Sequence, residues 1–186
     1  MSAGFQELLS AHLLAAGERQ EVARGVIGGR RYGVDLAAGT ITFADGPIIA
    51  AEMIGSASTE DGSWFWAWGN GSLGLPDDRL LASRRVAEQG AGLAVPELTE
   101  PRLELGDLIE VHSLGSVSTG LLDSDAYFVA EDGPIAVLLS LTAEPLALRP
   151  LDGSMLTITL MSNLGRYELP HRPMIECFLR RRGARD

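Results

Sequence analysis

The sequence has a single cysteine, no lysine, and neither a long apolar run nor a basic amino-terminal stretch. Because Cys177 has no second cysteine to pair with, a disulfide framework within the chain is excluded. The longest apolar run, from Ile135 to Leu139, is much shorter than the roughly 18 residues that cross a bilayer. Glu7 also lies where a signal peptide would be apolar. These absences predict a cytoplasmic protein that does not enter a membrane.

Cations are fewer than anions: 15 basic residues, all arginine, stand against 25 Asp and Glu, which gives a net charge of −10. A protein that binds phosphate backbones needs an excess of cations, so we expect no nucleic-acid partner. The exclusive use of arginine, together with many alanines and glycines, is typical of a GC-rich bacterial genome. The length of 186 residues is near the usual size of one domain, so residues 1–186 are interpreted as a single domain.

Short apolar runs separated by turn residues follow a first helix, which we expect from Phe5 to about Arg24. Alternating side chains predict four strands between Tyr32 and Trp68, with Asp45-Gly46 and Asp61-Gly62 among the turns that separate them. Such short connections join antiparallel neighbours, since parallel strands need crossovers of a dozen residues or more. This segment is therefore predicted to be an antiparallel meander.

The rest of the chain predicts more helices and one more pair of strands. We expect helices over residues 76–92, 107–119 and 170–182, and a hairpin over residues 127–141. In the last helix Cys177 shares an apolar face with Met174 and Phe178, so we expect it to be buried and unreactive. The predicted fold class is α+β: an antiparallel meander of four strands and a second hairpin, with helices packed on the sheet.

Motifs for nucleotides, metals and nucleophilic catalysis are weak. The segment from Gly69 to Gly74 fits the dinucleotide-binding pattern G-x-G-x-x-G, but it follows a hairpin-linked meander rather than a strand of a parallel βαβ unit. Asp77 and Asp78 would also repel a pyrophosphate. Three scattered histidines match no metal-ligand spacing, and Ser116 stands where a nucleophile elbow requires glycine. We therefore expect no cofactor and no metal.

Three tryptophans, Trp64, Trp66 and Trp68, alternate on one predicted strand. Strand periodicity places their indoles on one face, where they form either buried core or an aromatic wall for a ligand. We expect Trp64, beside a turn, to be the most exposed, Trp66 to be the most buried, and Trp68 to meet both core and ligand. Glu52 lies on the preceding strand among apolar residues and is a candidate polar anchor if it points to the same face.

The segment from Asp61 to Trp68, the pair Leu75-Pro76 and the stretch from Val95 to Pro101 resemble an uncharacterised bacterial domain family, which is commonest in actinobacteria. The short segment from Leu169 to Arg172 is similar as well, so the resemblance covers most of the chain. The resemblance implies no activity. It does imply a helix over residues 155–163, although the β-branched residues there favour a strand.

One class of function left open is a non-catalytic binding module for a protein partner or a small apolar ligand. The acidic surface would favour a cationic partner. The candidate binding residues are Trp66, Trp68, Glu52 and His112. An open cleft lined by indoles and poor in titratable groups would favour this class.

The alternative is an enzyme of unrecognised type. It requires at least two titratable side chains to converge in a pocket where their pKa values are shifted. The candidates are Glu52, Glu110, His112, Asp123 and Asp125. A carboxylate and a histidine within hydrogen-bond reach of each other would favour this class.

Overall fold

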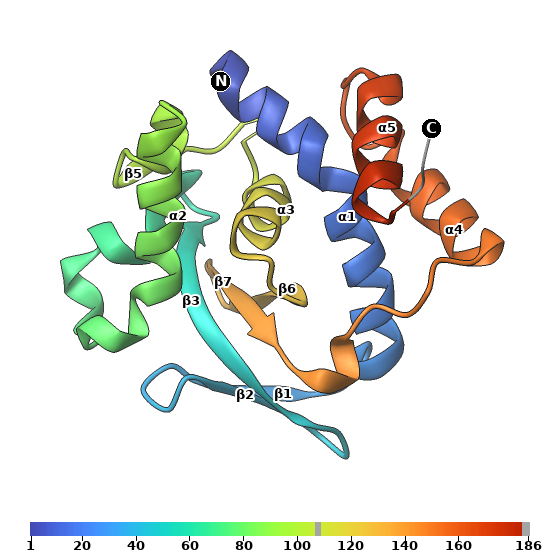
Figure 1. Ribbon diagram of the computed structural model, residues 1–186. Helices are drawn as coiled ribbons and strands as arrows, with labels where there is room; N and C mark the ends of the chain where they lie inside the picture. The colour runs from blue at the N-terminus through green and yellow to red at the C-terminus, as the bar shows by residue number, and fades with distance from the viewer. Residues whose placement is uncertain (107–108, 184–186) are drawn as a thin grey trace.

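The computed structural model describes residues 1–106 and 109–183, and it combines helices with one antiparallel sheet (Figure 1). Within these ranges the α-helices are α1 (Ala3–Ile27), α2 (Leu81–Gly92), α3 (Val111–Leu122), α4 (Gly153–Asn163) and α5 (His171–Arg181). The strands there are β1 (Tyr32–Asp35), β2 (Thr40–Phe43), β3 (Ile48–Ser58), β4 (Ser63–Trp66), β5 (Arg102–Glu104), β6 (Ala126–Asp132) and β7 (Ile135–Thr142). The predicted α+β class is confirmed.

The sheet begins as the predicted meander, because β1, β2, β3 and β4 pair in chain order and each is antiparallel to the next. The predicted second hairpin, β6 and β7, joins the sheet through pairing of β7 with β3. The long strand β3 is therefore paired on both edges: Gly55 lies opposite Trp66 of β4 and opposite Leu138 of β7. The short strand β5, which pairs with β4, adds to the strands that the sequence predicts.

A bulge in β3 allows this one strand to serve two cores. The register between β3 and β7 shifts between Met53 and Gly55, which leaves Ile54 as the extra residue. Ala57 belongs to one cluster of buried apolar residues, which we call the first core. Ala51 and Met53 belong to another cluster, which we call the second core. Because strand side chains alternate with a period of two, one extra residue moves the following odd-numbered positions to the opposite face.

Helices cover the sheet face that carries the first core, with α1 at the centre of this layer. Contacts join α1 to α3, α4 and α5, and Figure 1 shows α3 on one side of α1 with α4 and α5 on the other. The helix begins at Ser2, whose hydroxyl accepts the Phe5 N–H at 3.2 Å. Phe5 and Leu9 of α1 enter the same core as Leu114 of α3 and Phe178 of α5.

The second core lies where the sheet curls on itself. Phe43 of β2 packs edge-on against Phe128 of β6, with ring centroids 5.5 Å apart, and Tyr32 of β1 packs on Phe128 at 4.9 Å. The Tyr32 hydroxyl also accepts a hydrogen bond from the Glu131 N–H at 3.0 Å. β1 and β6 lie far apart in the pairing order, so these contacts require a strongly curved sheet. Ile27, at the end of α1, is buried in this core.

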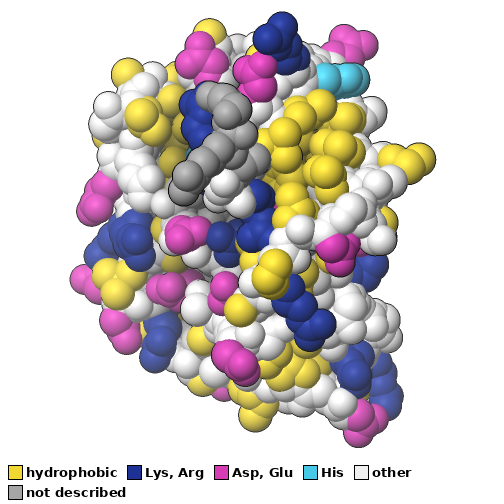
Figure 2. All heavy atoms as spheres, turned by 45° about the vertical axis from the view of Figure 1, so that its right-hand side comes forward, with side chains coloured by type: hydrophobic (Ala, Val, Ile, Leu, Met, Phe, Trp, Pro, Cys, Tyr) yellow, Lys and Arg dark blue, Asp and Glu magenta, His cyan; other side chains and the backbone are white. Residues whose placement is uncertain are grey.

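The segment after Asp152 is helical, as the family resemblance implies. The Asp152 carboxylate accepts the N–H three residues further on at 2.8 Å, which caps the start of α4. The buried side chains of α4 are Thr159 and Asn163, and Leu156 and Leu160 pack half-buried against the first core. Ile158 and Met161 are exposed. Figure 2, which brings α4 and α5 forward, shows apolar side chains gathered on this face of the molecule.

Some predicted boundaries differ from those of the structure. The strand with the tryptophans ends at Trp66, because Ala67–Gly69 forms a 3-10 turn. Two more such turns, Gly71–Leu73 and Asp77–Arg79, precede α2. The predicted start of the third helix, Asp107, lies outside the described residues, and α3 begins at Val111.

The prediction that Cys177 is buried is wrong. Met174 and Phe178, one helical turn apart, point α5 into the first core. Cys177 lies at the rim of that face, where it is half-buried and lines a shallow groove with Pro170 and Pro173. The helical spacing alone does not fix how far around a helix the buried face extends.

Candidate functional site

Trp64 and Trp66 belong to the buried core, which is the first of the two alternatives that the sequence leaves open. Both side chains have 0 % exposure, and their rings meet edge-on with centroids 5.3 Å apart. The Trp66 indole donates a hydrogen bond from Nε1 to the Glu97 carbonyl at 3.0 Å. In this structure Trp66 is therefore covered and presents no surface to a ligand.

The expectation that Trp64 is the most exposed of the three is wrong. Its place beside a turn predicts exposure, but β5 extends the sheet, so that Trp64 lies opposite Leu103. Gly55 of β3 leaves the space that the ring occupies, since a Cβ there would lie 2.4 Å from the Trp64 indole. A long-range strand pairing thus buries a residue that looks terminal in the local pattern.

Trp68 and Glu52 lie outside the cleft described below. Trp68 lies on the turn after β4 and is half-buried against the first core, and its backbone N–H donates to the Ser83 hydroxyl at 3.2 Å. Glu52 is exposed on β3, opposite Ser140 of β7. Neither residue lines the cleft around His112.

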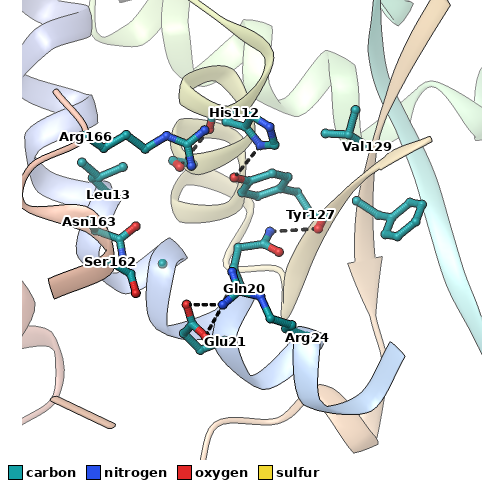
Figure 3. A pocket seen from close by; sticks show the side chains of 13 residues that line it. Leu13, Gln20, Glu21, Arg24, His112, Tyr127, Val129, Ser162, Asn163 and Arg166 are labelled. Carbon is teal, nitrogen blue, oxygen red and sulfur yellow. Dashed lines mark hydrogen bonds and ion pairs between the residues drawn. The ribbon is translucent and has the colours of Figure 1, made fainter. Parts of the chain in front are cut away.

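His112, by contrast, lines a cleft of about 270 Å³ in which α1, α3, β6 and the end of α4 meet (Figure 3). Its polar lining includes Gln20, Glu21, Arg24, Ser116, Asn163 and Arg166. Figure 3 shows Arg166 and His112 toward one end, Glu21 and Arg24 toward the other, and Gln20 with Tyr127 between them. The cleft therefore offers polar groups along its whole length.

Helical spacing explains how α1 forms one wall. Leu13, Gly17, Gln20 and Arg24 recur at intervals of three or four, and Glu21 follows Gly17 by four positions, so they lie on one face of the helix. Glu21 accepts two hydrogen bonds from one nitrogen of the Arg24 guanidinium, at 2.9 Å and 2.7 Å. The Gln20 amide donates to the Tyr127 carbonyl at 2.8 Å and so ties α1 to β6.

The opposite wall is formed by the first turns of α3 and by Tyr127 of β6. His112 Nδ1 and the Tyr127 hydroxyl are hydrogen-bonded at 3.2 Å. Burial, and then the positive charge of Arg166, lowers the pKa of His112, so the imidazole is neutral at pH 7. Burial raises the pKa of Tyr127, so its hydroxyl keeps its proton. The pair is therefore uncharged, and the positive charge of the cleft comes from its arginines.

Arg166 reaches the cleft from the segment after α4. Its guanidinium lies 3.3 Å from a Glu110 carboxylate oxygen and stacks over the Tyr167 ring at 5.7 Å. The Tyr167 hydroxyl donates to the same Glu110 oxygen, and burial and this bond raise the pKa of Tyr167. Glu110 thus holds both residues of the segment against the start of α3.

Asn163 packs directly on α1. A Cβ added at Gly17 would lie 2.4 Å from Asn163 Nδ2, so a larger residue fits there only if the Asn163 side chain shifts. Asn163 Nδ2 donates to the Thr159 carbonyl at 2.8 Å within α4. The close approach of Gly17 and Asn163 fixes the width of the cleft at this point.

The convergence required for the enzyme alternative is partial. The side-chain partner of His112 among the described residues is the Tyr127 hydroxyl rather than a carboxylate. Asp123 and Asp125 face Arg19 instead, at 2.6 Å and 3.8 Å. The structure therefore brings His112 and Glu110 to one region and leaves the other candidates elsewhere.

Most cleft residues were absent from the sequence-based candidates. The face shared by Gly17, Gln20 and Arg24 is readable from helical spacing, but nothing in the pattern shows that it stays open rather than packed. Arg166 lies 54 positions after His112 in the chain, so no local motif could join the two.

Among the residues described, no cluster of three His, Cys, Asp or Glu side chains could bind a metal ion. No described helix has the length and apolarity to cross a bilayer.

Comparison with known proteins places the chain at the level of a family. No curated protein and no solved structure matches it. A family model described as a family of unknown function, DUF6882, matches residues 6–142, which is well over half of the chain. The matched range includes Gln20, His112 and Tyr127, whereas Asn163 and Arg166 follow it. The chain belongs to this family of unknown function, DUF6882.

Proposed function

We propose that the protein is a non-catalytic binding module that holds a small molecule in the cleft between α1, α3, β6 and α4. The observation that carries the proposal is a cleft of about 270 Å³ where polar side chains from four elements converge. Ligand sites are typically concave, and a few oriented polar groups fix the position of the ligand. Leu13 and Val129 supply apolar surface here, and Gln20, His112 and Arg166 supply the polar groups.

Binding fits the cleft better than catalysis does. A general base needs a pKa near the operating pH and a partner that stabilises its charged form. The lowered pKa of His112 disfavours its protonated form, and its partner is a neutral hydroxyl. A neutral imidazole is suited to orient a ligand by hydrogen bonding.

The Trp-bearing sheet supports this proposal indirectly. With Trp64 and Trp66 buried, an apolar ligand has no exposed indole wall on β4. The cleft around His112 is largely polar, so we expect a ligand with polar groups rather than the purely apolar ligand that the tryptophans suggest.

The test is to fill the cleft with a side chain. Ser162 lines the cleft from the end of α4 and is exposed, and Ser154 is exposed on the same helix away from the cleft. A library of small fragments is titrated while the ring resonances of the histidines are followed by NMR. We expect saturable shifts of His112 in the natural protein and in Ser154→Trp, and their loss in Ser162→Trp. Failure of every fragment to shift His112, or equal binding by Ser162→Trp, would contradict the proposal.

A further inference from the structure

We infer that the ligand of this cleft carries a carboxylate, which the Arg166 guanidinium holds. The inference rests on the proposed function and names the chemical class of the ligand. It starts from the difference between the two arginines of the cleft. Arg24 is engaged twice by the Glu21 carboxylate, whereas Arg166 makes a single contact of 3.3 Å with Glu110.

A guanidinium has five N–H donors arranged as a planar fork. For the guanidinium of Arg166, the Glu110 contact is the one hydrogen bond found within the described part of the chain, and it involves one terminal nitrogen. The remaining edge of the fork is therefore left for a group outside the chain. Carboxylates match that fork with two parallel hydrogen bonds, which makes arginine the residue that recognises them best.

The position of Arg166 directs this edge to the cleft. Figure 3 shows its side chain extending across the end of the cleft toward His112 on α3. The Glu110 contact and the Tyr167 ring restrict the guanidinium before a ligand arrives. A donor restricted in this way loses less conformational entropy when it binds, which favours affinity.

The charges around the site favour a monoanion. The lining contains two guanidinium groups and one carboxylate, and Glu110 lies against Arg166 just beyond the lining. A second negative charge on the ligand would meet Glu110 and Glu21 without a further cation to offset it, because His112 is neutral at pH 7. This balance fits a monocarboxylate better than a phosphate monoester, which carries close to two charges at pH 7.

The rest of the ligand is small and partly apolar. Leu13, Phe128 and Val129 border the cleft beside the polar groups. A volume of about 270 Å³ admits a body of the size of one aromatic ring or a short branched chain. Benzoate, with its uncharged analogue benzamide and its cationic analogue benzylamine, is therefore a suitable probe set.

The experiment measures the affinity of the full chain for the three probes by calorimetry. Benzoate is expected to bind roughly tenfold more tightly than benzamide, because a charged hydrogen-bonded pair is lost with the amide, and benzylamine is expected not to bind. Arg166→Gln is expected to reduce benzoate affinity roughly tenfold and to leave that for benzamide unchanged. Arg172→Gln is the matched control, because Arg172 is exposed on α5 and neither it nor its ion-pair partner Glu176 lines the cleft.

The outcomes separate this inference from the proposed function. Equal affinity for benzoate and benzamide, or unchanged benzoate binding in Arg166→Gln, would overturn the carboxylate class. Shifts of His112 by uncharged fragments would then still support the cleft as a binding site. If benzoate binds the natural protein and Ser162→Trp equally, the site lies elsewhere and both conclusions fall. Circular dichroism on each variant shows whether a loss of affinity comes from loss of fold.

Discussion

Single residues divide between those that hold the fold and those that line the cleft, and the tryptophans belong to the first group. Trp66→Ala is expected to cost about 3–5 kcal/mol of unfolding free energy, because a fully buried indole leaves a large cavity. Trp68→Ala is expected to cost clearly less, since the Trp68 side chain is only half-buried. Urea denaturation of the two variants measures the difference. Equal losses would mean that Trp68 is as deeply packed as Trp66.

His112 and Tyr127 show a different kind of residue role. Their hydrogen bond spans α3 and β6, and both groups are partly or fully buried while still bordering the cleft. A pair of this kind can be replaced on one side without opening a large cavity. Tyr127→Phe keeps the ring and removes the hydroxyl, so we expect a small loss of stability, about 0.5–1.5 kcal/mol. We also expect a changed NMR position of the His112 ring, while an unchanged resonance would show that the bond is absent in solution.

At the scale of elements, the seating of α4 on α1 depends on one glycine. Gly17→Ala would place a Cβ 2.4 Å from Asn163 Nδ2, whereas at Gly25 of the same helix no atom lies within 4 Å of the added Cβ. Alanine favours a helix interior over glycine by up to about 1 kcal/mol. We therefore expect Gly25→Ala to stabilise the protein slightly and Gly17→Ala to destabilise it and to weaken binding in the cleft. Thermal unfolding and fragment titration check both effects.

The double variant Gly17→Ala with Asn163→Ala gives this prediction its control. Truncation of Asn163 removes the atoms that the new Cβ would strike, so α4 can approach α1 again. We expect the double variant to regain part of the stability lost in Gly17→Ala. If Gly17→Ala is as stable as Gly25→Ala, the close contact between the two helices does not exist in solution.

The elements also mark how far the sequence can be read. The meander was predictable because Asp45-Gly46 and Asp61-Gly62 act locally and short turns force antiparallel pairing. β5 was not, because its pairing with β4 joins residues about 40 positions apart in the chain and carries no turn signal. The bulge at Ile54 could not be predicted either, because apolar residues of β3 lie on both sides of it. The change of face is visible only in the structure, where the residues before the bulge are buried in the second core.

The cleft was less predictable than the fold. His112 was a candidate by its residue type, but its partners Tyr127 and Arg166 come from other elements, and burial decides which side chains meet. Trp66 was also a candidate, and its burial depends on helices and on β5 rather than on its own strand. The hydrophobic pattern shows which face of a helix or strand is buried. It does not show where two packed elements leave a space between them, and the cleft is such a space.

At the scale of the whole molecule, α1 connects both cores and the cleft, and it carries a buried histidine. His12 is 5 % exposed and packs against Gly120 of α3, where an added Cβ would lie 1.8 Å from Nδ1. Burial, and then the charge of Arg181 on α5, lowers the pKa of His12 from 6.5 to about 4. The fold therefore holds this histidine neutral between three helices.

This neutral histidine predicts that the protein loses stability in mild acid. Between pH 6.5 and about pH 4 the unfolded chain binds a proton at His12 that the folded chain does not, so the free energy of unfolding falls as the pH falls. The loss from His12 reaches about 3 kcal/mol at pH 4, since one pKa unit corresponds to about 1.4 kcal/mol. The lowered pKa of His112 also makes the free energy of unfolding fall as the pH falls. The raised pKa of the buried Glu18 has the opposite effect in the pH range where Glu18 gains its proton. Urea denaturation at several pH values should therefore show that the free energy of unfolding changes less steeply with pH in His12→Gln than in the natural protein.

The exposed His171 provides the matched control, and His171→Gln should keep the pH dependence of the natural protein. A pH dependence that His12→Gln leaves unchanged would mean that the imidazole gains its proton within the folded protein, so that the contact between α1 and α3 admits a charge.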